Sequence, residues 1–289
     1  MKRKFNIITF FIFLFYSFCS VTAESKYDIE ELNSFFWKAK SETSTVYMFG
    51  SIHLAREDMY PLPENIETAF ENSDALVVEV DLNKANPIEL MQRAMYKDER
   101  TLKSELSEET YNKIHKLLLK YEVPQMIYLK MKPWMAVITV LMMQLQEKGF
   151  DESMGIDKYF MDKAIDKKEI LQLESAEAQL NLLDTEFDKL SDEFVRYSLM
   201  DNDNMIEQVD TMVLYWKEGN YKAMDKLALE IPGEFPEFQP IMDKLYTERN
   251  IKMVGKIEEY LKTDKTYFVV VGAAHLIGKD GIINLLIEK

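Results

Sequence analysis

The sequence predicts an α/β fold: a central mixed sheet formed from the two chain ends, with flanking helices and a helical insertion or cap in the middle. Apolar, β-branched runs with the length of buried strands occur towards both ends, at 75–80 and 267–271. Between these runs, most of the chain shows the apolar spacing of helices. No segment has the composition of a linker, so we expect a single domain over 24–289.

The first predicted elements are a hairpin and a short helix. The hairpin has strands at 35–39 and 45–49, joined by a turn. The segment Gly50-Ser51-Ile52-His53 follows at the exit of its second strand. A helix is expected at 64–72, and the buried strand at 75–80 contains Glu79.

Helices dominate the middle of the chain, and strands return near its end. In 108–121, apolar side chains recur every three or four residues, which is the spacing of one helix face. The elements expected after residue 86 are helices at 87–96, 108–121, 133–148 and 157–165, a strand at 169–173, a long acidic helical stretch at 175–226, a helix at 242–261, a strand at 267–271 and a final helix that opens at Asp280-Gly281.

The first 23 residues have the three-part layout of a secretory signal peptide. Three basic residues open the chain at positions 2–4, and 5–18 is almost wholly apolar. Val21-Thr22-Ala23 places small residues at the two positions that signal peptidase recognises. We therefore expect a signal peptide at 1–23 and an exported mature chain, periplasmic or extracellular, that begins at Glu24.

Two alternatives to a cleaved leader arise from the same segment. An uncleaved anchor needs about 20 apolar residues to cross a membrane, and the apolar run at 5–18 is shorter. A lipoprotein would be modified at Cys19, but Phe18 stands where a small residue is expected. No later segment is apolar enough to span a membrane, so none is expected after signal cleavage.

Charge and cysteine content narrow the range of partners and chemistries. Loss of the leader removes three basic residues and no acidic ones, so the formal net charge changes from −15 to −18. No nucleic acid partner is expected, because binding to phosphates requires basic patches. The only cysteine is Cys19. The mature chain is therefore expected to have no disulfide, cysteine nucleophile or thiolate ligand, which leaves nitrogen and oxygen to bind any metal.

Two of the three histidines lie in a degenerate internal repeat. The segments VYMFGSIHL at 46–54 and FVVVGAAHL at 268–276 align without a gap, and each is an apolar strand followed by Gly-x-x-His-Leu. Ligands bind at the carboxyl ends of strands in open α/β sheets, so His53 and His275 are expected to project into one site. A structural role explains either histidine alone more simply, but the matching pair favours function. His115 lies among lysines in a predicted amphipathic helix and is expected at the surface.

Carboxylates complete the candidate site. Glu79 lies in an otherwise apolar predicted strand, where a charge is costly unless it is paired or bound to a metal. Glu174 ends the predicted strand EILQL in the same way, and a structural salt bridge explains it equally well. Two imidazoles and a carboxylate, with open positions for water, are a familiar hydrolytic metal set. Such a metal would lower the pKa of bound water and supply a nucleophile near neutral pH.

The segments FGSIHLA, LVVEVD, MGIDKYFMDKAIDKKEILQLESAEAQL, ERN at 248–250 and FVVVGAAHLIGKDGI follow one another along the chain. This ordered set resembles the TraB/GumN family, whose members include bacterial pheromone-shutdown proteins and the animal Tiki proteins. The resemblance covers nearly all of 24–289 and identifies this range as a TraB/GumN-like domain. No P-loop, GxGxxG or GxSxG motif points to another chemistry.

The resemblance implies a Tiki-like active site. Tiki proteins are described as metal-dependent proteases with two GxxH motifs and a glutamate. Carried over to this sequence, the resemblance implies that His53 and His275 are metal ligands. It also implies that Glu79 is either a third ligand or the general base.

Four further residues acquire expected roles from the same resemblance. Arg249 and Asn250 match the Arg-Asn pair of the family, and Glu174 matches its Leu-Glu motif. Arg249 would then be catalytic, stabilising an oxyanion or docking a substrate carboxylate, and Glu174, Asn250 and Ser51 would contact substrate. The family often has threonine at the position of Ser51 and glycine at that of Ala274, and neither difference removes a ligand.

Two functions follow from these residues. In the first, the chain is an exported hydrolase that cleaves peptide substrates with a divalent metal ion, and manganese, cobalt, zinc and iron all remain open. In the second, it binds and sequesters a peptide or another small ligand without turning it over. The intact set of two histidines and one glutamate favours the first, and metal analysis of the purified protein would separate the two.

Overall fold

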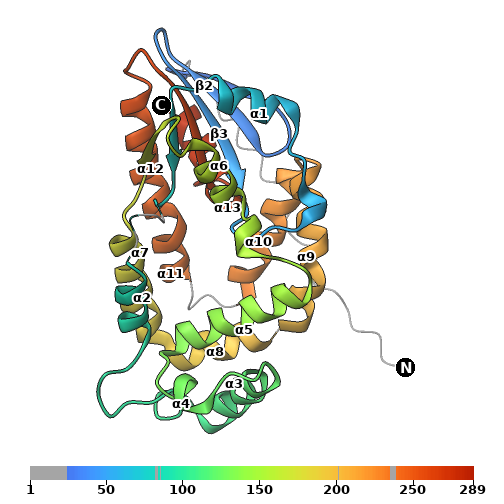
Figure 1. Ribbon diagram of the computed structural model, residues 1–289, viewed down its shortest axis with the longest axis vertical. Helices are drawn as coiled ribbons and strands as arrows, with labels where there is room; N and C mark the ends of the chain where they lie inside the picture. The colour runs from blue at the N-terminus through green and yellow to red at the C-terminus, as the bar shows by residue number, and fades with distance from the viewer. Residues whose placement is uncertain (1–24, 82–83, 85, 201, 235–238) are drawn as a thin grey trace, which may run out of the picture.

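The computed structural model describes residues 25–81, 84, 86–200, 202–234 and 239–289 of the 289-residue chain. The predicted leader at 1–23 lies outside these residues. Within the described ranges, no helix is both long and apolar enough to cross a membrane. The strands gather towards one end of the molecule, and several helices from the middle of the chain form the other end (Figure 1).

Six strands of the described chain form one mixed sheet in the order β1-β2-β3-β6-β4-β5. The first two pairs are antiparallel, and the remaining pairs are parallel. This arrangement confirms the predicted α/β fold with a mixed sheet. The strands are β1 (Asp28–Glu31), β2 (Phe36–Lys40), β3 (Thr45–Ser51), β4 (Ala75–Val78), β5 (Glu169–Gln172) and β6 (Thr266–Gly272).

The last strand of the chain lies between two strands from its beginning. β6 pairs with β3 on one side and with β4 on the other, and it is parallel to both. Parallel strands end at the same edge of a sheet. The segments that follow β3, β4 and β6 therefore meet at one edge, although the paired ends of β3 and β6, Ser51 and Gly272, lie 221 positions apart in the sequence.

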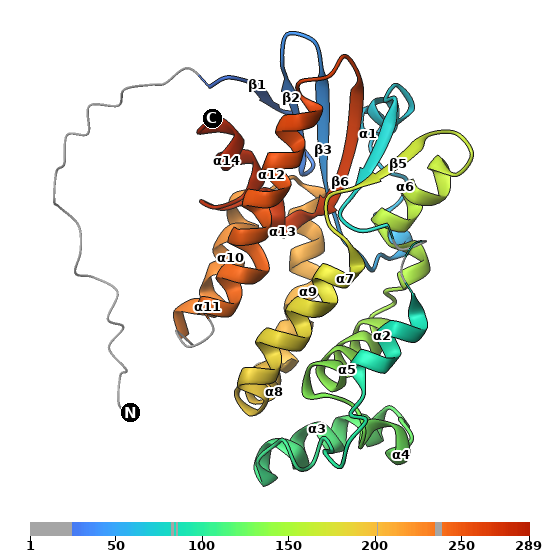
Figure 2. The same ribbon diagram turned by 90° about the vertical axis from the view of Figure 1, so that its left-hand side faces the viewer.

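Valine and phenylalanine side chains explain why this sheet is buried on both faces. Val269, Val270 and Val271 of β6 have no exposed surface, and β-branched residues suit a strand covered on both sides. Helix α6 packs against β4, β5 and β6, and its Phe160 ring lies 4.8 Å from that of Phe268. Figure 2 shows α12 and α14 on the opposite side of the sheet.

The helices largely follow the expected ranges. Those around the sheet are α1 (Glu64–Glu71), α6 (Ile156–Ala164), α12 (Glu248–Tyr260), α13 (Ala273–Leu276) and α14 (Ile282–Ile287). The others are α2 (Pro87–Ala94), α3 (Glu108–Lys120), α4 (Gln125–Tyr128), α5 (Pro133–Glu147), α7 (Ala176–Leu182), α8 (Ser191–Met200), α9 (Asn202–Lys217), α10 (Tyr221–Glu234) and α11 (Gln239–Met242).

Helices from the middle of the chain have a hydrophobic core of their own. Side chains of α3, α4, α5 and α8 form a cluster separate from the core under the sheet. Its fully buried members include Leu118, Tyr128 and Ala136. Figure 2 places α3, α4 and α5 at the end of the molecule away from the sheet. This group is compatible with the predicted helical insertion.

The structure corrects several sequence-based boundaries. The strand expected at 75–80 ends at Val78, so Glu79 follows β4 instead of lying within it. The predicted long helix at 175–226 is interrupted by a π-helix at Leu183–Phe187 and a 3-10 helix at Asp188–Leu190. The helix expected from 242 begins as a π-helix at Asp243–Thr247. Apolar periodicity cannot detect such changes of pitch, because the helical spacing continues through them.

His115 is less exposed than the sequence predicted. Its ring stacks on Tyr111 with an interplanar angle of 9°, and its Nδ1 lies 2.7 Å from the hydroxyl of Tyr128. The lysines around it point to solvent, but His115 itself faces the boundary of the helical core. It is a structural residue far from the candidate site in sequence and in packing.

Candidate functional site

The two Gly-x-x-His segments leave adjacent strands at the same edge of the sheet. β3 and β6 run parallel, and Ser51 pairs with Gly272 at their carboxyl ends. After Ser51 the chain continues to His53, whereas after Gly272 it enters the short helix α13, which carries His275. The helical turn of α13 places the ring of His275 in the interior of the protein.

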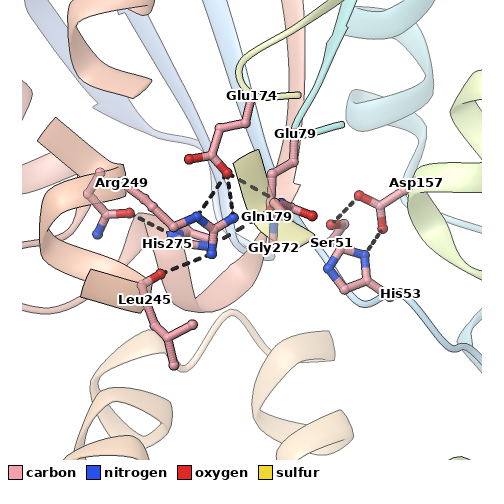
Figure 3. A network of polar contacts seen from close by, with 11 residues as sticks. Ser51, His53, Glu79, Asp157, Glu174, Gln179, Leu245, Arg249, Gly272 and His275 are labelled. Carbon is pink, nitrogen blue, oxygen red and sulfur yellow. Dashed lines mark hydrogen bonds and ion pairs between the residues drawn. The ribbon is translucent and has the colours of Figure 1, made fainter. Parts of the chain in front are cut away.

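Three side chains converge on the backbone of Gly272, as Figure 3 shows. A Cβ atom placed on this glycine would lie 3.4 Å from Oε2 of Glu79, 3.5 Å from Cδ2 of His275 and 3.8 Å from Nε2 of His53. The structure therefore brings together the two histidines and the glutamate that the sequence singled out. A residue without a side chain at 272 leaves the space between them open.

His53 is hydrogen-bonded through Nδ1 to Asp157. Its Nδ1 lies 2.8 Å from Oδ2 of Asp157, and Ser51 donates its hydroxyl to Oδ1 of the same carboxylate at 2.9 Å. Asp157 lies in the first turn of α6. Gly155, which precedes α6, contacts the backbone of His53. A Cβ atom placed on Gly155 would lie 2.2 Å from the carbonyl oxygen of His53. The hydrogen bond and the charge of Asp157 raise the pKa of His53 to about 9. The side chain of His53 is 61% exposed, so solvent moderates this interaction.

His275 is buried and is held by an amide instead of a carboxylate. Its Nδ1 lies 2.6 Å from Oδ1 of Asn250, whose Nδ2 donates to the carbonyl of Asp280 at 2.8 Å. The Asn250 contacts orient its oxygen towards the ring, so Nδ1 of His275 carries the proton and donates it. The ring of Tyr246 covers His275 at 5.3 Å. Burial lowers the pKa of His275 to about 4, which makes the ring neutral at neutral pH.

Glu79 lies between the two imidazoles and is ionised. Its Oε1 accepts hydrogen bonds from Gln179 and Arg249, and its Oε2 accepts from the backbone N–H of Gly272 at 3.2 Å. Oε2 also lies 3.8 Å from Nε2 of His275. Burial alone would raise the pKa of Glu79, but the surrounding His275, Arg249 and His53 and the Gly272 N–H hold it below its usual value.

Arg249 joins the two carboxylates of the site into one network. It donates to Oε2 of Glu174 from Nε at 2.8 Å and to Oε1 of Glu79 from Nη2, while Nη1 donates to the carbonyl of Leu245. Gln179 bridges the same two carboxylates. All four residues to which the resemblance assigned an oxyanion or substrate contact, Arg249, Glu174, Asn250 and Ser51, therefore touch other site residues. Arg249 contacts Glu79 and Glu174, Ser51 contacts Asp157, and Asn250 contacts His275.

Comparison with known proteins identifies the family of the chain. The family model described as the TraB/PrgY/gumN family matches residues 35–289. This chain belongs to the TraB/PrgY/gumN family. It is 26% identical over 246 residues to the protein named "Uncharacterized protein YbaP" in Escherichia coli (strain K12) and to that of the same name in Shigella flexneri. Each match covers 83% of this chain and 87% of the relative. No solved structure matches the chain.

Two residues that hold the site in this TraB/PrgY/gumN member were not predicted. Asp157 backs His53, and Gln179 bridges Glu79 to Glu174. A sequence signal for Asp157 exists, because it shares the buried face of α6 with Phe160, Met161 and Ala164. A carboxylate on the apolar face of a helix needs a partner. Gln179 sits half-buried in α7, and its position gives no comparable signal.

The chemical types of the donor atoms in the site suit a divalent cation, but their spacing does not. Both imidazoles have Nδ1 occupied by an acceptor, which is how metal-binding histidines are commonly oriented. Nε2 of His53 lies near Gly272, and Nε2 of His275 lies 3.8 Å from Oε2 of Glu79. In the part of the chain that the structure describes, however, no group of three or more His, Cys, Asp or Glu side chains is arranged to hold a metal ion. Oε1 of Glu79 is paired with Arg249, whereas Oε2 faces His275.

Two surface concavities lie away from this family site. One, of about 520 Å³, is formed by β2, β3 and α1, and the other, of about 580 Å³, lies around Tyr60, Met154 and Tyr159. Neither contains His53, Glu79 or His275. The convergence of titratable groups at Gly272, and not the size of a hollow, therefore locates the candidate site.

Proposed function

We propose that the chain is an exported, divalent-metal-dependent hydrolase that cleaves peptide substrates. The observation that carries the proposal is the meeting of His53, His275 and Glu79 around Gly272, with Nε2 of His53 facing the same space as Oε2 of Glu79. Membership of the TraB/PrgY/gumN family fits this proposal but does not by itself specify an activity. Its resemblance to the Tiki proteins is the source of the peptidase assignment.

Each residue has a role that its contacts suggest. The neutral His275 offers an Nε2 lone pair, and His53 offers a second one once its own Nε2 has lost its proton. Glu79, kept ionised by its neighbours, supplies negative charge between the two rings. A bound divalent cation would supply Lewis-acid chemistry, polarising a peptide carbonyl and acidifying water.

Arg249 takes a different role from the one that the sequence implied. Its guanidinium is engaged by Glu79, Glu174 and the carbonyl of Leu245, so it is not a free group for an oxyanion. We assign it instead to orienting Glu79 and keeping its carboxylate ionised. Whether Glu79 acts as a ligand or as the general base is then decided by substitution.

One observation favours a second candidate function. Glu79, Glu174, Arg249 and Gln179 are joined in one hydrogen-bonded network beside the two histidines. A network of this kind suits a protein that binds and sequesters a peptide or small ligand without cleaving it. In that case the polar network would recognise the ligand through hydrogen bonds.

Metal content and peptide cleavage, measured on the same samples, separate these functions. Elemental analysis of the purified protein should find a divalent metal, and mass spectrometry should find cleavage of a peptide library. His53→Ala and His275→Ala should each lose both properties, whereas His115→Gln, which can keep the contact to Tyr128, should keep both. Metal without cleavage favours the binding protein. If the wild type binds no divalent metal even in excess, the hydrolase proposal is wrong.

Glu79→Gln distinguishes the two roles left open for this residue. If Glu79 is the general base, the variant should retain metal and lose about 10²–10⁴-fold in rate. If Glu79 is a ligand, the variant should also bind metal more weakly.

Export is tested by N-terminal sequencing of protein from the native host, which should find Glu24 as the first residue. A start at Met1 or a lipid on Cys19 would refute signal cleavage at this position.

A further inference from the structure

The two histidines of the site are hydrogen-bonded at Nδ1 to residues of different chemical type, a carboxylate and an amide. Asp157 accepts hydrogen bonds at both oxygens, from Nδ1 of His53 and from the hydroxyl of Ser51. Asn250 accepts from Nδ1 of His275 at its oxygen but donates from its nitrogen to the carbonyl of Asp280. The second contact therefore places a different requirement on each residue. A double acceptor suits the first position, and an acceptor joined to a donor is required at the second.

We infer that Asp157 and Asn250 are positioning residues that fix both imidazoles as Nδ1–H tautomers and turn both Nε2 atoms towards the space that Glu79 shares with Gly272, and that an aspartate cannot replace Asn250. For metal binding this inference rests on the proposed function. For tautomer and orientation it rests only on the hydrogen bonds. It assigns to Asn250 a contact with His275 instead of the contact with substrate that the sequence suggested.

Asp157 and Asn250 are both too deeply buried to reach another partner. Asp157 and Asn250 are only 7% and 2% exposed. A buried carboxylate is costly without hydrogen-bond donors, and Ser51 and His53 provide them here. The close contact between Gly155 and the carbonyl of His53 fixes α6 against the first motif, so Asp157 cannot move away from the ring without a backbone shift.

The tautomers are measurable without any metal. The chain has three histidines, so ¹⁵N spectra of the ring nitrogens can be assigned by substituting each in turn. With each ring in its neutral form, Nδ1 should carry the proton in His53 and His275, which is the less common tautomer of a free imidazole. Asp157→Ala should shift His53 alone towards the Nε2–H tautomer, and Asn250→Ala should shift His275 alone. If the wild type shows Nε2–H in both rings, the inference is overturned.

Conservative variants test whether the two positions differ as inferred. Asp157→Asn keeps an acceptor for His53, and its new N–H can donate to the hydroxyl oxygen of Ser51, so the Nδ1–H tautomer should survive. Asn250→Asp places a second acceptor against the carbonyl of Asp280, so this variant should lose the tautomer of His275 as fully as Asn250→Ala does. Circular dichroism establishes that each variant is folded. Equal rescue by both conservative variants would contradict the assignment.

Zinc affinity gives the functional consequence. Loss of a residue that orients a metal-binding histidine commonly weakens binding about 10–100-fold. We expect a loss of this size in Asp157→Ala and Asn250→Ala, measured by isothermal titration calorimetry with zinc chloride, and a smaller loss in Asp157→Asn. Wild-type tautomers as expected, but no zinc binding, would reject the metal proposal and leave the positioning role intact. Unchanged zinc affinity in both alanine variants would reject the role of Asp157 and Asn250 in metal binding.

Discussion

The two segments that share the Gly-x-x-His-Leu pattern place their histidines in opposite electrostatic environments. His53 has a 61% exposed side chain and a carboxylate partner, and its pKa is raised. His275 has a 7% exposed side chain and an amide partner, and its pKa is lowered. The repeated motif determines where each histidine lies, whereas residues far away in the sequence determine its charge.

The path of the chain after each strand produces this difference. After β3 the backbone bends at His53 without entering a helix, and the His53 side chain remains near solvent beside Asp157 of α6. After β6 the backbone turns at once into α13, which carries His275 under Tyr246 and against α12. Two histidines of unlike charge around one carboxylate are better suited to binding a cation or polar ligand than two imidazolium ions, which would repel each other.

The buried side of the site should be the more sensitive to loss of a charge. Arg249→Met leaves Glu79 and Glu174 without their shared cation, and breaking a buried ion pair costs about 3–5 kcal/mol. We expect a loss of this order in the free energy of unfolding, measured by urea denaturation. Arg93→Met is the matched control, because Arg93 contacts Glu89 and Asn181 at the surface, and its loss should cost about 1 kcal/mol or less. Similar losses of unfolding free energy in Arg249→Met and Arg93→Met would contradict the greater sensitivity of the buried side.

His275 should make the protein less stable in acid. Its pKa is about 4 in the folded state and 6.5 in the unfolded state, so the unfolded chain binds a proton that the native chain does not. The native state is therefore disfavoured as pH falls from 6.5 to about 4, by on the order of 2–3 kcal/mol. Unfolding measured across this range should be less pH-dependent in His275→Gln than in wild type, and unchanged in His115→Gln. Equal slopes in all three proteins would refute the lowered pKa.

His53 should act in the opposite direction and at higher pH. Its folded-state pKa is about 9, so the native state keeps a proton that the unfolded state loses. This contribution is fully present below pH 6.5 and disappears as pH rises through about 9. We expect a smaller effect than for His275, because the ring is largely exposed. His53→Gln should flatten the alkaline side of the stability profile, and a slope that matches wild type would contradict the pairing with Asp157.

The smallest effect is expected at Ser51. Ser51→Ala removes one of the two hydrogen bonds to Asp157 and leaves the other, so it should cost about 1 kcal/mol of stability. The tautomer of His53 should be unchanged, because Asp157 still accepts from its Nδ1. Thermal unfolding measures the first effect and ¹⁵N spectroscopy the second. A loss of the His53 tautomer would show that Ser51, and not α6, places the carboxylate.

The sequence was sufficient for five of the six strands in the described sheet, for most helices and for the three converging residues, but β1 was not predicted. Strand periodicity and the repeated Gly-x-x-His pattern are local signals, and they point to His53 and His275 directly. Glu79 was found because a charge in an apolar run is unusual, although the strand ends one residue before it. Contacts between distant segments could not be predicted, since nothing near Asn250 indicates that its nitrogen would meet Asp280 and its oxygen His275.

A methyl group added at Gly272 tests whether both motifs share one space. In Gly272→Ala the new Cβ would be in ordinary contact with His275 and His53, at 3.5 and 3.8 Å, so the fold should be retained. Gly255→Ala is the control, because a Cβ at that helical position meets nothing within 4 Å. Proton NMR of Gly272→Ala should show nuclear Overhauser contacts from the introduced methyl to both imidazoles and none to His115. Contacts to only one of the two rings would mean that His53 and His275 do not form one site.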